Sequence, residues 1–150
     1  MTELLDRYRG GYDAVVAALA GATDAELDAR PADGGWTARE CVHHLADSES
    51  RSMGRLRQVL AGEPDIQPYD QDAWAAALPY HLPIDGALAV LAAVRSYCLT
   101  TLEALDDADW SKAGRHPEWD EPYTVALWLE IYASHPYEHA AQIAQARASS

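Results

Sequence analysis

Apolar side chains recur every three to four residues in four stretches of this sequence, the spacing of α-helices that bury one face. The first stretch covers about residues 2–19, and Gly10 and Gly11 weaken its middle by roughly 1 kcal/mol each relative to alanine. The third stretch begins at Asp85, which we expect to cap it, and the fourth runs from after Pro122 to about Ala146. No alternating segment is long enough to form a sheet. The pattern predicts an all-α four-helix bundle that occupies residues 1–150 as a single domain.

The second stretch has the clearest helix start in the chain. Thr37 and Glu40 have the spacing of a capping box, and Trp36 can pack on Cys41 as a hydrophobic staple. At roughly 100° per residue, one face of this helix carries an apolar stripe that includes a histidine, while His43 lies almost opposite. The residues of this stripe are Cys41, His44, Leu45, Ser48, Ser52, Leu56 and Val59.

Residues 61–83 separate the second and third helices and are rich in proline, acidic and aromatic residues. Connections of this length inside a compact domain are usually functional or wrap a core. We therefore expect a long crossover connection. Its Tyr69 and Trp74 either line a pocket above a functional site or simply anchor the loop.

Three histidines fall on the apolar faces of two predicted helices: His44 on the second, and His135 and His139 on the fourth. Buried imidazoles need partners, and one divalent metal ion can satisfy several of them at once. Three nitrogen ligands leave coordination positions open, which is the pattern of a catalytic site; zinc, nickel, iron and manganese all remain possible. Pro136 lies between the pair, so we expect a kink or π-bulge there, or a helix that breaks before the site.

Other residues near these faces could take part in chemistry. Arg95 sits within the third apolar stripe and is costly to bury without an anion, so it either binds a carboxylate of a ligand or pairs with an internal acid such as Glu138. Glu138 could accept a hydrogen bond from a ligating histidine, act as a general base, or be an ordinary solvated residue. Cys41 is interpreted as a core residue rather than a ligand. The remaining histidines are interpreted as surface residues: His43, His81 and His116.

The net charge and the distribution of apolar residues exclude some classes of binding partner. The net charge of −13 and the pI near 4.6 make nucleic acid and anionic membrane surfaces unfavourable partners. No signal peptide or membrane-spanning apolar run is visible, and both cysteines fall on helical core stripes. These features favour a reduced, cytoplasmic protein.

Several ordered motifs resemble the YfiT-like, bacillithiol transferase branch of the DinB superfamily. They are DGGWT at 33–37, HHLADS at 43–48, PDIQPYD at 64–70 followed by Trp74, HPE at 116–118, and residues 132–143 with two histidines. The resemblance implies a four-helix bundle with a long crossover, often a homodimer. It also implies a divalent metal bound by His44, His135 and His139. The chain departs from this branch at Glu49, Arg95 and residues 136–138, where the branch tends to have histidines.

Members of this superfamily include metal-dependent thiol transferases, and the resemblance implies the same activity here. A low-molecular-weight thiol (mycothiol, bacillithiol or glutathione) would be activated at the metal and would attack a small electrophile. In this interpretation Arg95, Tyr69 and Trp74 contact the thiol, and Glu138 and Arg95 assist catalysis. The alternatives are a hydrolase in which the metal activates water, and a non-catalytic dimer that binds a metal or ligand.

Overall fold

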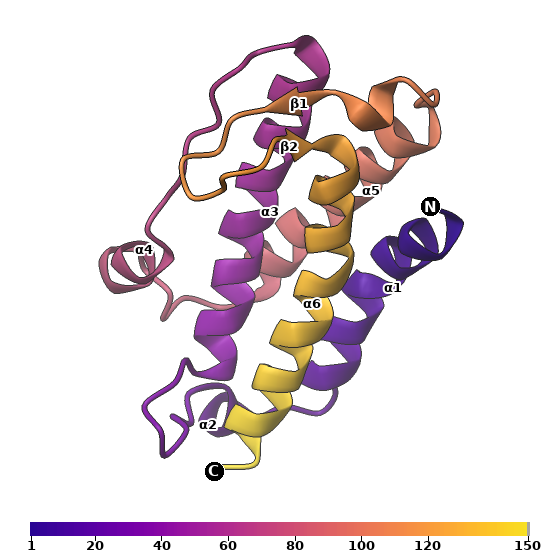
Figure 1. Ribbon diagram of the computed structural model, residues 1–150. Helices are drawn as coiled ribbons and strands as arrows, with labels where there is room; N and C mark the ends of the chain where they lie inside the picture. The colour runs from indigo at the N-terminus through magenta and orange to yellow at the C-terminus, as the bar shows by residue number, and fades with distance from the viewer. Residues whose placement is uncertain (150) are drawn as a thin grey trace.

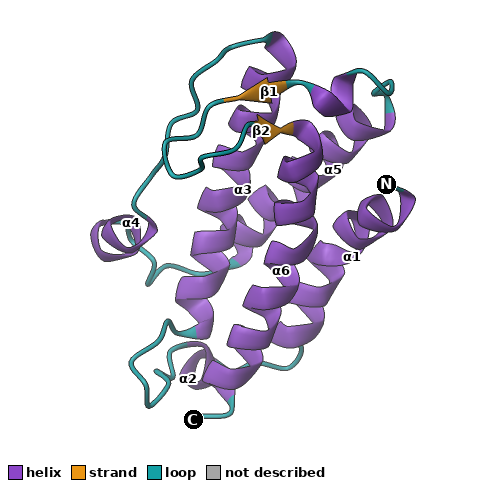
Figure 2. Ribbon diagram, in the orientation of Figure 1, coloured by secondary structure: helices purple, strands orange, loops and turns teal. Residues whose placement is uncertain are grey.

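The computed structural model describes residues 1–149, and long helices dominate it. The predicted all-α bundle is confirmed. Figure 2 shows the long helices joined by extended loops, with two short strands at one end of the bundle. None of the described helices combines the length and apolar character needed to cross a bilayer. The elements in chain order are α1 (Thr2–Leu19), α2 (Asp24–Leu27), α3 (Ala38–Ala61), α4 (Gln71–Ala77), α5 (Asp85–Glu103), the 3₁₀ helix η1 (Asp109–Ser111), β1 (Ala113–Gly114), β2 (Tyr123–Thr124) and α6 (Val125–Arg147).

The long helices run in two directions. In Figure 1, α1 and α6 run downward, whereas α3 and α5 run upward. Helix α6 packs against α1 and α3, and α5 packs against the same two helices. Since α3 and α5 are parallel neighbours, the chain between them must travel back along the bundle, and α4 lies on this crossover.

Local sequence signals explain where the helices begin. The capping box at Thr37 is present: the Glu40 amide donates to Thr37 Oγ1 at 3.1 Å, and the Thr37 amide donates to the Glu40 carboxylate at 2.8 Å. Helix α3 ends at Gly62, whose φ of 79° is left-handed and suits glycine. The expectation that Asp85 caps α5 was wrong. Ile84 is the N-cap, and Asp85 lies in the first turn, where its charge favours the positive end of the helix dipole.

Two short features were not expected from the pattern. Helix α4 forms within residues 61–83 because the Asp70 carboxylate caps it, accepting from the amides of Asp72 and Ala73. Strands β1 and β2 pair antiparallel, with Ala113 opposite Thr124. Strands of two residues are too short to show alternation, which is why the sequence pattern missed them.

The hydrophobic core is divided into two clusters along the bundle axis. We call the cluster near the strands the strand-side core and the cluster near α2 the α2-side core. A layer of polar side chains lies between them and contains Glu49, Arg95 and the three histidines. The strand-side core includes Tyr8, Leu56, Ile66, Cys98 and Trp128. The α2-side core includes Val15, Leu45, Cys41, Leu91 and Ile143.

Arg95 joins all the long helices within this layer. Its side chain is 4% exposed and forms an ion pair with Glu49, whose side chain is fully buried. It also donates to the carbonyl of Tyr8 on α1 and, at 3.2 Å, to the carbonyl of Tyr132 on α6. The acid that pairs with Arg95 is therefore Glu49 on α3, and the expected partner Glu138 lies on the exposed side of α6.

The contact between Arg95 and Tyr132 explains how α6 tolerates Pro136. In a regular helix the Tyr132 carbonyl would accept from the amide of residue 136, but proline has no N–H. The Arg95 guanidinium supplies the missing donor. The expected π-bulge or break is not found: α6 is an uninterrupted α-helix from Val125 to Arg147.

Gly11 makes room for this arrangement. A Cβ atom at Gly11 would lie 2.7 Å from Arg95 Nη2 and 3.0 Å from Pro136 Cγ, both too close. The glycine that weakens α1 locally is thus required for α1 to approach α5 and α6.

Candidate metal centre

Three imidazoles converge in the polar layer between α3 and α6. The Nε2 atom of His135 lies 3.4 Å from His44 Nε2 and 3.0 Å from His139 Nε2. The candidate ligand atoms of the three residues all lie within 4.8 Å of one another. Helix α3 supplies His44, and one turn of α6 supplies the other two.

Burial favours the neutral form of all three imidazoles. Burial lowers the pKa of His44 to about 3, with a further contribution from His139. Burial also lowers the pKa of His135 well below its usual value and lowers that of His139. A neutral imidazole has a free lone pair, which is the form that binds a metal ion.

Gln142 fixes the orientation of His139. The Nδ1 atom of His139 lies 2.8 Å from Gln142 Oε1, and an amide oxygen can only accept. The proton is therefore on Nδ1, and Nε2 points its lone pair at the other two histidines. This is the role considered for Glu138, which is instead exposed on α6. The Nδ1 atoms of His44 and His135 are buried and have no hydrogen-bond partner.

Trp36 covers the histidine cluster from one side. Its ring centroid lies 4.7 Å from that of His44 and 6.3 Å from that of His139. The sequence pattern suggested a packing role against Cys41, and Trp36 does pack on the α2-side core, which contains Cys41. Cys41 Sγ lies 3.8 Å from Gln142 Oε1, and burial raises the pKa of the thiol to about 12, so Cys41 is not placed as a ligand.

The donor set fits a divalent metal ion. Zinc binds imidazole nitrogen at about 2.0–2.1 Å, which places the nitrogens of a tetrahedral site about 3.3 Å apart. The Nε2 separations of 3.0 and 3.4 Å are close to this value. His44, His135 and His139 would hold the ion and leave at least one position free for a small molecule.

Two cavities reach the histidine cluster. One of about 730 Å³ is lined by His135 together with residues of the crossover, including Tyr69. The other, of about 320 Å³, is lined by His139, Gln142 and Trp36. Gln71, the first residue of α4, lines both. Trp74 packs on Tyr69 with ring centroids 4.8 Å apart and is not among the lining residues.

The arginine in the larger of these cavities is Arg55, not Arg95. Arg95 lines a separate cavity of about 240 Å³ between α1 and α5, and both its Nη atoms are occupied within the protein. Arg95 therefore does not line either of the cavities that reach the histidines. Arg55 follows His44 by eleven residues, about three helical turns, so spacing along α3 could have indicated it.

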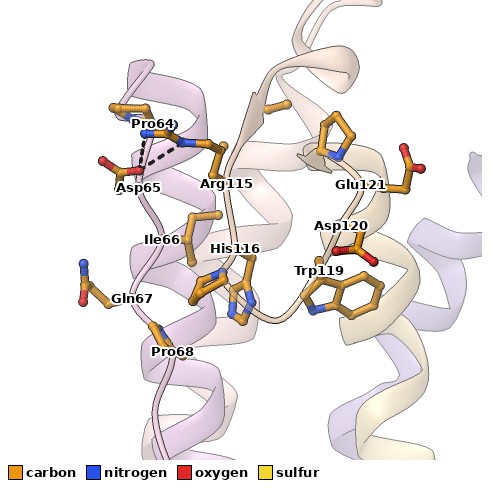
Figure 3. Close-up of a pocket in the computed structure, with 14 residues that line it drawn as sticks. Pro64, Asp65, Ile66, Gln67, Pro68, Arg115, His116, Trp119, Asp120 and Glu121 are labelled. Carbon is orange, nitrogen blue, oxygen red and sulfur yellow. Dashed lines mark hydrogen bonds and ion pairs between the residues drawn. The ribbon is translucent and has the colours of Figure 1, made fainter.

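A third cavity, of about 740 Å³, lies away from the histidines, between residues 64–68 and 113–122 (Figure 3). His116 lies on its wall and is 4% exposed, so the expectation of a surface histidine was wrong. Its ring stacks on Tyr123, and its Nδ1 accepts from the Glu118 amide at 3.3 Å. His81 is exposed, and His43 Nε2 lies 3.0 Å from the Leu82 carbonyl.

Comparison with known proteins identifies the family of this chain. The sequence model of the DinB superfamily matches residues 7–143. The chain belongs to the DinB superfamily. It is 37% identical over 126 residues to YfiT of Bacillus subtilis, covering 82% of this chain and 70% of that protein. It is 35% identical over 119 residues to a protein of Oceanobacillus iheyensis, covering 79% and 69% respectively. Both relatives carry the name "putative metal-dependent hydrolase".

The fold agrees as well. The structure of Bacillus subtilis YfiT, described as a probable metal-dependent hydrolase with an unusual four-helix bundle topology, superposes with a TM-score of 0.88. The match covers 95% of this chain and 82% of that one at 31% identity. The parallel pair α3 and α5, joined by the long crossover, is the topological feature of this DinB-superfamily protein that an up-down bundle lacks.

Proposed function

We propose that this DinB-superfamily protein is a metal-dependent enzyme that activates a low-molecular-weight thiol and transfers it to a small electrophile. The observation that supports this most directly is the convergence of three neutral imidazole nitrogens beside a cavity of about 730 Å³. A cavity of this volume is typical of small-molecule sites. The choice of a thiol rests on the motif resemblance to thiol transferases.

The protein groups have separate tasks in this proposal. His44, His135 and His139 hold the ion, and Gln142 keeps His139 in the ligating tautomer. A divalent ion bound there would offer an open position and lower the pKa of a thiol or a water molecule placed at it. Trp36 and the two cores restrict water around the histidines, and Tyr69 borders the space for the substrates.

Neither cysteine of the chain is suited to act as the nucleophile at this site. Burial raises the pKa of Cys41 to about 12 and that of Cys98 to about 11, so neither thiol ionises at neutral pH. The carboxylates that line the histidine-facing cavity are not placed as buried bases: Asp70 caps α4, and the Glu118 side chain is 67% exposed. A thiol with an ordinary pKa near 8.5 needs little assistance from a base, whereas water needs more.

Hydrolysis of an ester or amide is the second candidate, and the names of the relatives favour it. The same three histidines and the same cavity would serve, with water in place of the thiol. A binding protein without turnover is the remaining alternative.

Thiol dependence separates these functions. Protein loaded with zinc, nickel, iron or manganese is incubated with a monohalobimane and, in turn, mycothiol, bacillithiol and glutathione. Conjugate should form faster than without protein for at least one thiol, and the acceleration should be lost in His139→Ala and kept in His43→Ala. Release of product from an ester or amide without any thiol would support the hydrolase instead. No turnover of either kind would contradict both.

A further inference from the structure

Arg55 is a half-buried arginine on the wall of the cavity that contains His135. Its Nη1 donates to the Tyr132 hydroxyl at 3.2 Å, and its Nη2 donates to the Gln67 carbonyl at 3.2 Å. Among residues 1–149, no carboxylate forms an ion pair with it. Six other arginines do pair with carboxylates: Arg9, Arg30, Arg39, Arg95, Arg115 and Arg147.

Neither of the acidic side chains that line this cavity forms an ion pair with Arg55. The Asp70 carboxylate accepts two backbone amides at the start of α4. The Glu118 carboxylate is largely exposed and lies 3.9 Å from His116 Nδ1. A guanidinium that has lost part of its water and has only neutral acceptors is a favourable site for an anion.

Tyr132 connects Arg55 to the metal centre. The hydroxyl of Tyr132 accepts from Arg55, and its ring lies 6.0 Å from the His135 ring, centroid to centroid. One small molecule can therefore contact Arg55 at one end and the histidine cluster at the other.

We propose that Arg55 is the residue that selects substrates carrying an anionic group, a carboxylate or a phosphate. The anion would be held by the guanidinium while the reacting atom lies at the three histidines. This inference rests on the proposed function only in using the same cavity as the substrate site. The net charge of −13 repels anions at long range, so the preference must come from this local contact.

The test compares two thiols with the same number of carbon atoms, one ending in a carboxylate and the other in a neutral hydroxyl. 3-Mercaptopropionate and 3-mercaptopropanol are titrated calorimetrically into zinc-loaded protein, with acetate and inorganic phosphate as competitors. We expect the anionic thiol to bind about tenfold tighter or more, because hydrogen bonds between charged groups are the strong ones. Stronger competition by acetate indicates a carboxylate, and stronger competition by phosphate indicates a phosphate.

Variants assign the preference to Arg55. Arg55→Gln should lose the preference, and Arg55→Lys should keep part of it. Arg57→Gln should keep all of it, since Arg57 lies on the same helix but is exposed over the Tyr97 ring. Zinc content and melting temperature, measured for each variant, separate loss of the site from loss of the fold.

Two outcomes would overturn the proposal. A preference that survives Arg55→Gln would place the anion elsewhere. Equal binding of the two thiols by the unmodified protein, with a preference that emerges in Glu118→Gln, would make Arg55 the partner of Glu118. Anion selectivity without thiol transfer would instead reject the proposed reaction and leave the role of Arg55 intact.

Discussion

Replacing Arg95 by methionine tests how much the buried ion pair between Arg95 and Glu49 contributes to the free energy of unfolding. The change removes the guanidinium and leaves the fully buried Glu49 carboxylate with Ser52 Oγ, at 3.3 Å, as its remaining side-chain partner. It also removes the donors to the carbonyls of Tyr8 and Tyr132. Breaking a buried pair in this way costs about 3–5 kcal/mol of unfolding free energy. For a domain of this size that corresponds to a fall in melting temperature of roughly 10 °C or more.

The loss of unfolding free energy in Arg95→Met should increase as the pH rises. Burial raises the pKa of Glu49, and Arg95 opposes that rise. Without Arg95 the folded-state pKa moves further above the unfolded value of about 4.3, so the folded variant binds more protons than the unfolded chain. The contribution of protonated Glu49 to the stability of the variant is fully present below the pKa of Glu49 in the unfolded chain. It is lost as the pH rises, by up to about 1.4 kcal/mol per pH unit, until the pH passes the pKa of Glu49 in the folded variant. The penalty should therefore be smaller near pH 5 than near pH 8.

The assay is urea unfolding followed by far-ultraviolet circular dichroism, with chelator present so that metal binding does not contribute. The double variant Glu49→Met with Arg95→Met should recover most of the loss, because no unpaired charge then remains in the core. A penalty for Arg95→Met below about 1 kcal/mol would refute the reasoning. So would a double variant as unstable as the single one, since the loss would then come from packing.

Four further outcomes are expected. His44→Ala should lose bound metal by elemental analysis, whereas His43→Ala should retain it, because only the His44 ring joins the cluster. Gln142→Ala should weaken metal affinity by about 10–100-fold in a chelator competition, with Gln145→Ala as the unaffected control from the same cavity wall. Gly11→Ala should destabilise the protein by about 1–3 kcal/mol in urea, although alanine favours helices, because its Cβ would overlap Arg95 and Pro136. Light scattering should give the mass of a homodimer, as the family resemblance implies, and a monomer at every concentration would contradict this.

The bundle and the histidine cluster could be predicted because both depend on short-range spacing. The capping box at Thr37 sets the start of α3, and the helical period then decides that His44 and not His43 faces inward. The pair on α6 is one turn apart in the sequence itself. Such spacings predict the structure reliably because helix geometry alone decides which residues lie on the same face.

The residues that sequence reasoning misplaced depend on contacts between distant segments. Burial of Arg95 implied an acidic partner, but Glu49 lies 46 positions away on another helix, and helix spacing alone does not pair two helices. No role for Gln142 is visible in the sequence, because only the folded chain shows its amide against His139. Arg55 was overlooked since an arginine at the edge of a stripe is usually solvated.

The polar layer has a consequence for the alignment of the helices along the bundle axis. Sliding α3 by one turn, about 5.4 Å, would carry Glu49 away from Arg95 and into an apolar cluster. The same slip would exceed the 3.4 Å that separates the Nε2 atoms of His44 and His135. The ion pair between Glu49 and Arg95 therefore fixes the position of α3 along the bundle axis. Because Arg95 also donates to the Tyr132 carbonyl, α6 is fixed to the same level, and the imidazoles of α3 and α6 stay at the same height.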